Sequence, residues 1–199
     1  MVFMGRDTYD HANLRNPIGK FLMNKYFEKL SEKLKTIKFS NAIDLGAGKG
    51  YVTNFVGKTK GTYPIALDND EEKLDFIRKK YPLIKVVKGD VREIPFEKNY
   101  FDFVISTQTI EHLSKDDSKR TLEEISRIGK KNCIITVPNF PYWNLKNIAR
   151  GKYLKSFGNT PDHLQQWTSK GFEKMLKNYF ENVSVERVYC WNFASVSNE

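Results

Sequence analysis

The spacing of apolar residues predicts one long helix near the start of the chain. Apolar side chains recur at every fourth position over residues 17–37, at Ile18, Leu22, Tyr26, Leu30 and Leu34. This spacing is typical of an amphipathic helix, and Pro17 is well suited to a first helical turn. Residues 1–38 are therefore expected to form an N-terminal helical extension.

After residue 40, short apolar runs alternate with helical patterns. Runs typical of strands lie at 41–45, 63–67, 83–87, 101–105 and 132–137, and helical patterns lie at 50–58, 71–80, 117–128 and 168–179. Such alternation, with nearly continuous apolar strands, indicates a parallel sheet with helices on both faces. Two further β-like runs, 182–189 and 191–197, predict an antiparallel edge. The expected fold class is α/β: one domain over residues 1–199 with a Rossmann-like, doubly wound, mostly parallel seven-stranded sheet.

Residues 138–167 interrupt this pattern. They hold three of the seven prolines and many aromatic residues without a clear period. A loop of this length inside a compact domain is usually functional. It follows the fifth strand, at the edge of the sheet where the carboxyl ends of parallel strands meet ligands. We therefore expect an irregular loop insertion that forms part of a ligand site.

Composition and charge add little to this picture. The chain is 40% hydrophobic, which is enough for one sizeable core, and its net charge of +9 is mostly lysine spread over predicted helix surfaces. Scattered lysine is usually a solvated face and only weakly favours nucleic acid. No apolar run reaches the roughly 20 residues of a membrane helix, and the start lacks the features of a secretion signal. With Cys133 and Cys190 in apolar strands, a reduced cytoplasmic protein without a membrane partner is expected, and a single disulfide stays open.

The strongest local motif is Asp44-Leu45-Gly46-Ala47-Gly48-Lys49-Gly50, which closes the first strand and opens a helix. Glycines there permit a tight turn and let a ligand approach the backbone. A dinucleotide fingerprint starting at Gly46 needs glycine at position 51, where the chain has Tyr51, so a nicotinamide oxidoreductase is disfavoured. An acid two residues before the first glycine suits a ligand with positive charge better than a pyrophosphate.

Two more aspartates follow successive strands. Asp68 ends the second predicted strand, where an acid binds ribose hydroxyls in the Rossmann arrangement, and Asp90 follows Gly89 at the end of the third. Each alone is often a turn residue. Three strand-end aspartates in register after a glycine-rich turn predict a single ligand site.

These motifs resemble the class I S-adenosylmethionine (SAM)-dependent methyltransferases, of the broad type that includes ubiquinone-pathway O-methyltransferases. The resemblance covers about residues 40–180 and rests on AIDLGAGKG, IALDND, KGDVREIPF, YFDFVIST, IEHL and IITVPN. It implies SAM as cofactor. The implied contacts are Asp44, Gly46, Ala47, Gly48 and Gly50 for the methionine part, Asp68 and Asn69 for the ribose, Asp90 and Val91 for the adenine, and Thr107 and Gln108 for the sulfonium end.

Candidates for the methyl-acceptor side are Glu111, His112 and His163, in IEHL and PDHLQQWT. These segments also resemble enzymes that methylate the terminal 2′-hydroxyl of small RNAs and bind a divalent metal through two glutamates and two histidines. Here Gln108 occupies one glutamate position, and hard cations favour charged oxygen ligands. We therefore expect no metal, and we expect His163 to act as a base or to orient the acceptor.

The expected activity is transfer of the SAM methyl group to a small-molecule acceptor at oxygen, with nitrogen left open. The alternatives are a divalent-metal-assisted RNA 2′-O-methyltransferase and a SAM-binding protein without catalysis. The N-terminal extension either packs on the sheet or covers the acceptor pocket as a lid, with Tyr9 near the cofactor. Residues 138–167 would supply the acceptor side, and the oligomeric state is left open.

Overall fold

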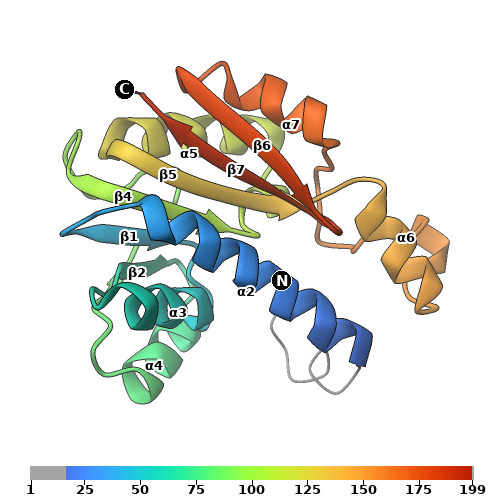
Figure 1. The fold of residues 1–199 in the computed structure, drawn as a ribbon, viewed down its shortest axis with the longest axis horizontal. Coiled ribbons are helices and arrows are strands. Elements are labelled where there is room, and N and C mark those ends of the chain that lie inside the picture. The colour runs from blue at the N-terminus through green and yellow to red at the C-terminus, as the bar shows by residue number, and fades with distance from the viewer. Residues whose placement is uncertain (1–16, 199) are drawn as a thin grey trace.

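A seven-stranded sheet organises the protein, as a computed structural model that describes residues 17–198 shows (Figure 1). In chain order, its strands are β1 (Ala42–Leu45), β2 (Ile65–Asp68), β3 (Val86–Lys88), β4 (Phe101–Thr107), β5 (Gly129–Pro138), β6 (Asn182–Val188) and β7 (Trp191–Ser197). The helices are α2 (Pro17–Thr36), α3 (Tyr51–Lys60), α4 (Glu71–Lys80), α5 (Lys115–Ile128), α6 (Tyr142–Ala149) and α7 (Ser169–Leu176), with short 3₁₀ turns η1 (Ile110–His112) and η2 (Leu154–Ser156).

The strand order is β3-β2-β1-β4-β5-β7-β6. The first five strands in this order pair in parallel, and β7 pairs antiparallel with both β5 and β6. The predicted fold class is therefore confirmed, including the antiparallel edge. The chain runs outward from β1 to β3 and then returns to β4, so the order reverses between β1 and β4. In open α/β sheets ligands bind at such a switch point, beyond the carboxyl ends of the strands.

Helices cover both faces of the sheet, because successive side chains of the central strands point to opposite sides. On β4, Val104 belongs to the core cluster that contains α5 and α7, whereas Phe103 and Ile105 belong to the cluster that contains α2 and α3. The nearly continuous apolar character of β4 follows from this two-sided burial. None of the described helices is long and apolar enough to cross a membrane.

The start and end of several helices are set by capping residues. Asp70 accepts hydrogen bonds from the backbone N–H groups of Glu72 and Lys73, as its place before α4 predicts. Thr168 caps α7 in the same way. Ser114 accepts from the N–H of Asp117 and begins α5 two residues before the predicted start at 117. The strand predicted at 83–87 is also shifted, because only Val86–Lys88 pairs with β2.

The prediction that residues 138–167 lack regular structure is wrong. Helix α6 lies in this segment and projects beyond the end of β5 (Figure 1). Its buried face is largely polar: Asn144 and Asn147 are buried with Trp143, and the apolar residues Leu145 and Ile148 are exposed. A hydrophobic-periodicity argument looks for an apolar buried face, so it cannot find this helix.

Helix α2 packs on the sheet as part of the core. Tyr26, Leu30 and Leu34 are fully buried, and the hydroxyl of Tyr26 forms a 2.8 Å hydrogen bond with Oγ1 of Thr136 on β5. Cys133 and Cys190 are both free thiols, so the disulfide left open by the sequence is absent. The position predicted for Tyr9 lies outside the described residues.

We predict that Leu30→Ala destabilises the domain through the loss of core packing under α2. Truncation of a fully buried leucine removes apolar contact and leaves a cavity, which lowers the free energy of unfolding by about 2–5 kcal/mol. Asn24→Ala on the exposed face of the same helix should change it by no more than about 0.5 kcal/mol. Urea denaturation measures both. Equal, small effects would show that α2 does not contribute to the cooperative core.

Candidate functional site

The glycine-rich turn lies at the switch point of the sheet. The N–H groups of Gly46 and Ala47 both donate to the carbonyl of Leu67 on β2, at 2.9 and 3.0 Å. On its other side the turn contacts Thr109, just beyond β4: a Cβ on Gly46 would lie 2.5 Å from the Thr109 side chain. Since Gly46 also has φ of +70°, only glycine fits there without strain. The turn therefore joins the ends of β1, β2 and β4.

Asp44 is buried at the base of this turn and only half satisfied. It is 1% exposed, and its Oδ2 accepts a 2.6 Å hydrogen bond from the hydroxyl of Thr53. Its Oδ1 is buried without a hydrogen-bond partner among the described residues. Burial raises the pKa of Asp44 to about 7, and the nearby charge of Asp68 acts in the same direction. A buried carboxylate oxygen with no donor suits a ligand that brings a positive charge or an N–H group.

Asp68 connects the turn to the next helix. It is 5% exposed, its Oδ2 accepts from the N–H of Gly48 at 2.8 Å, and its Oδ1 accepts from the N–H of Asp70 at 3.0 Å. Each oxygen retains acceptor capacity, since a carboxylate offers about four lone-pair sites. Asn69 follows as an exposed residue. Asp44 and Asp68 thus lie on adjacent parallel strands beside the same glycine-rich turn, as the sequence predicts.

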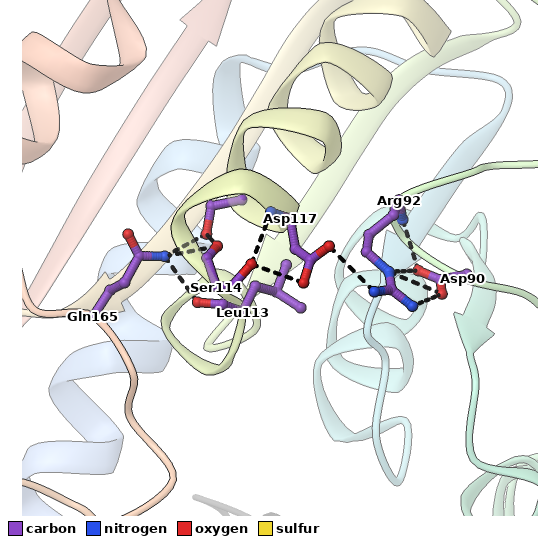
Figure 2. A network of polar contacts seen from close by, with 7 residues as sticks. Asp90, Arg92, Leu113, Ser114, Asp117 and Gln165 are labelled. Carbon is purple, nitrogen blue, oxygen red and sulfur yellow. Dashed lines mark hydrogen bonds and ion pairs between the residues drawn. The ribbon is translucent and has the colours of Figure 1, made fainter.

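Asp90 lies further out, beyond β3, and it is held by an arginine (Figure 2). Arg92 donates to both Asp90 oxygens and reaches Asp117 on α5 with Nη1, at 3.2 Å. The hydrogen bonds from Arg92 hold the pKa of Asp90 below its usual value. Asp90 therefore remains a carboxylate and an acceptor, with its neighbour Val91 half-buried. The partner Arg92 was not predicted from the sequence.

Thr107 and Gln108 end β4 on the opposite side of the turn. Both are buried, and Gln108 adopts φ of +54°, an uncommon backbone conformation for a residue other than glycine. Its side-chain Nε2 donates to Oγ1 of Thr136 at 3.3 Å, while its Oε1 has no partner among the described residues. Thr136 in turn is bonded to Tyr26. Helix α2 therefore supports this side of the site from behind.

The three acceptor-side candidates form one cluster. Glu111, His112 and His163 each place a potential ligand atom within 4.8 Å of the other two. Glu111 is 1% exposed, and both its carboxylate oxygens are buried without a hydrogen-bond partner in the described part of the chain. Burial raises the pKa of Glu111 well above its usual value and lowers that of His163 to about 3. The cluster begins two residues after Thr109, so it adjoins the glycine-rich turn.

Backbone and side-chain hydrogen bonds fix the His163 segment to η1 and α5. The carbonyl of Glu111 accepts from the N–H groups of Leu164 and Gln165, at 2.8 and 3.2 Å. The side-chain Nε2 of Gln165 donates to the carbonyl of Leu113 at 2.9 Å (Figure 2). It also lies within hydrogen-bond distance of the Ser114 carbonyl and the Ser118 hydroxyl. The sequence does not indicate that Gln165 holds this segment in place, because its hydrogen-bond partners lie about 50 positions away in the chain.

Comparison with known proteins gives the family. Residues 43–137 match the family model described as a methyltransferase domain. Over 137 residues the chain is 28% identical to 2-methyl-6-phytyl-1,4-hydroquinone methyltransferase, chloroplastic, from Arabidopsis thaliana, an alignment that covers 66% of this chain and 39% of that protein. The chain belongs to the class I SAM-dependent methyltransferases. The cofactor of this methyltransferase domain is accordingly SAM.

Solved structures share the fold of this methyltransferase. The PH0226 protein from Pyrococcus horikoshii OT3 superposes with a TM-score of 0.71 at 19% identity, over 96% of this chain and 93% of that one. The small RNA methyltransferase HEN1 superposes with a TM-score of 0.65 at 18% identity, over 89% of this chain and 25% of that one. The chain spans less than half the length of the first curated relatives that it matches.

We predict a pH-dependent stability difference between this methyltransferase and its Asp44→Asn variant. Because the pKa of Asp44 rises from 3.8 to about 7 on folding, the folded state holds an extra proton between these pH values. The contribution of Asp44 to stability therefore falls as pH rises from about 4 to 7, by on the order of 4 kcal/mol at most. Urea denaturation of the unliganded proteins should show wild type losing stability relative to the variant across this window. A difference that does not change with pH would contradict the assignment.

Proposed function

We propose that this chain is an enzyme that transfers the methyl group of SAM to an oxygen atom of a small-molecule acceptor. The observation that carries the proposal is the buried, half-satisfied carboxylate of Asp44 beside a glycine-rich turn. In this proposal, Asp44 and the turn from Gly46 to Gly50 receive the methionine part of SAM. Asp68, with Asn69, receives the ribose hydroxyls, and Asp90, with Val91, receives the adenine.

Bound SAM would supply a methyl group attached to a positively charged sulfur, and this sulfur would become a neutral thioether when the methyl group is transferred. The contribution of the chain is to align the acceptor and exclude water. Thr107 and Gln108 are buried beside the turn and would line the reacting end. The rings of His112 and His163 lie edge to face with centroids 5.0 Å apart. Nδ1 of His112 is bonded to the carbonyl of Asp162, so the other ring nitrogens of this pair would hydrogen-bond the acceptor hydroxyl and hold it in place. The hydroquinone acceptor in the name of the Arabidopsis relative supports a small molecule rather than a macromolecule.

Transfer of labelled methyl groups into a cell extract tests this proposal. The extract is incubated with the protein and methyl-labelled SAM, then split into RNA, protein and small-molecule fractions. We expect label in the small-molecule fraction. Asp68→Ala should reduce SAM affinity more than tenfold by calorimetry, because each hydrogen bond to a charged group contributes roughly 1.5–3 kcal/mol.

Asp68→Asn is the matched variant, since it keeps the size of the side chain and one acceptor oxygen. It should weaken SAM binding less than Asp68→Ala. Thermal melting of both variants without ligand controls for loss of the contact between Asp68 and Gly48. Unchanged SAM affinity in a folded Asp68→Ala protein would remove Asp68 from the cofactor site.

A second candidate function is metal-assisted methylation of an RNA 2′-hydroxyl. The observation in its favour is the cluster of Glu111, His112 and His163: one carboxylate and two imidazoles within 4.8 Å fit a divalent cation, which would also satisfy the unpartnered oxygens of Glu111. The fold shared with HEN1 is a second reason to test it. The residues fit a metal ion incompletely, because Gln108, at the position of the second glutamate, has a neutral side chain that donates to Thr136.

Chelation separates the two candidates. For the small-molecule enzyme, we expect labelling to survive EDTA and Mn²⁺ to leave the melting temperature unchanged. For the RNA enzyme, EDTA abolishes labelling of RNA, Mn²⁺ restores it, and electron paramagnetic resonance detects bound Mn²⁺ that Glu111→Gln releases. RNA binding should also weaken steeply as salt rises, because phosphate contacts release counterions. Metal-independent, salt-insensitive activity rules out the second candidate.

A further inference from the structure

Lys146 on α6 is a half-buried cation next to the acceptor-side cluster. Its ammonium lies 3.1 Å from the centroid of the Trp143 ring and 6.0 Å from that of Trp191. The Trp143 ring also packs against His163, with centroids 5.5 Å apart and planes inclined by 33°. Lys146 is therefore one aromatic ring away from His163, a member of the acceptor-side cluster.

The ammonium of Lys146 has no carboxylate partner among the described residues. Other half-buried lysines of this chain do: Lys29 and Lys33 both bind Glu186, at 2.6 and 2.8 Å. An aromatic ring attracts a cation but does not neutralise its charge as a carboxylate would. A buried charge is unfavourable unless it is paired, and burial lowers the pKa of Lys146 to about 8. Lys146 thus lacks the counter-ion that comparable lysines have.

Within the described residues, the charged side chains that act on Lys146 are positive. The sequence has no acidic residue between Glu124 and Asp162, and the charges of Arg150 and Lys152 disfavour the charged form of Lys146. The nearby thiol of Cys190 is not a counter-ion, because burial raises its pKa to about 11. On the same aromatic cluster, the indole N–H of Trp191 is buried without a partner in the described part of the chain. Within residues 17–198, both the Lys146 ammonium and the Trp191 indole N–H therefore lack an acceptor oxygen.

We infer that Lys146 binds an anionic group of the methyl acceptor, so that the enzyme selects small acids, carboxylates or phosphates, over neutral molecules. This inference rests on the proposed function, because it takes the Glu111, His112 and His163 cluster as the acceptor side. In that arrangement Trp143 separates the anion-binding ammonium from His163, so the acid group and the reacting hydroxyl would occupy different ends of one ligand. Lys146 is then a specificity-determining residue, and the reaction itself does not require it.

Calorimetry with three related probes tests the inference at pH 7. Phenol is neutral, 4-hydroxybenzoate carries a carboxylate, and phenyl phosphate carries a phosphate, so the two acids distinguish the kinds of anion. S-adenosylhomocysteine is added in excess to fill the cofactor site. We expect the wild-type protein to bind at least one acid tenfold or more tightly than phenol. Lys146→Met should reduce this preference to less than threefold, and Lys146→Arg should retain most of it.

Lys155→Met is the matched control, since it removes the same charge from the exposed η2 turn of the same segment. It should leave the preference for acids intact, and melting curves verify that all variants fold. A wild-type protein without preference for the acids, or a Lys146→Met protein that keeps the preference, overturns the inference. Binding of the probes needs no methyl transfer. Selective binding without any label transfer would therefore contradict the proposed function alone.

Discussion

The packing of Gly46 between β2 and Thr109 is the constraint on which the site depends. The turn after β1 must donate to the carbonyl of Leu67, must bring Gly46 so close to the Thr109 side chain that no Cβ fits, and must leave β1 with a positive φ. Since β1 and β4 are adjacent at the point where the strand order reverses, this close approach creates the ligand-binding edge. The N–H of Gly48 in this turn holds Asp68, whereas Asp44, at the end of β1 just before the turn, is held by the hydroxyl of Thr53 on α3.

The acceptor side depends on contacts of a different kind. The turn is built from consecutive residues, whereas the His163 segment is held by residues distant in the chain, through the Glu111 carbonyl and the Gln165 side chain. A network of polar contacts extends from Gln165 through Ser114 to the charged residues Asp117, Arg92 and Asp90 (Figure 2). Exposed pairs of this kind contribute little stability each, but they connect the outer edge of the cofactor side to the start of α5, on which the acceptor side rests.

Much of the fold, and the grouping of Asp44 and Asp68 beside the glycine-rich turn, could be predicted from the sequence, and the reasons are local. Each central strand is an apolar run, α4 and α7 begin at the capping residues Asp70 and Thr168, and the glycine-rich turn is a contiguous motif. What the sequence could not show depends on tertiary contacts. Helix α6 was missed because Asn144 and Asn147 form its buried face and bond to the carbonyls of Phe157 and Gly158. Likewise, the spacing of residues 17–37 predicts a helix, but not the bond from Tyr26 to Thr136.

Three ionisable side chains at the candidate site, Asp44, Glu111 and Lys146, lack a full set of polar partners among the described residues. Elsewhere, half-buried charges are paired: Arg127 binds Glu124, and Lys33 binds Glu186. In the described part of the chain, one oxygen of Asp44 and both oxygens of Glu111 have no hydrogen-bond partner, and Lys146 contacts aromatic rings but no carboxylate. Such groups lower the stability of the unliganded protein. We expect bound ligands to supply the missing hydrogen bonds and opposite charges. The buried carboxyl of Asp44 argues for a cationic cofactor at one end of this edge, and the ammonium of Lys146, next to Trp143 and His163, argues for an anionic group on the acceptor.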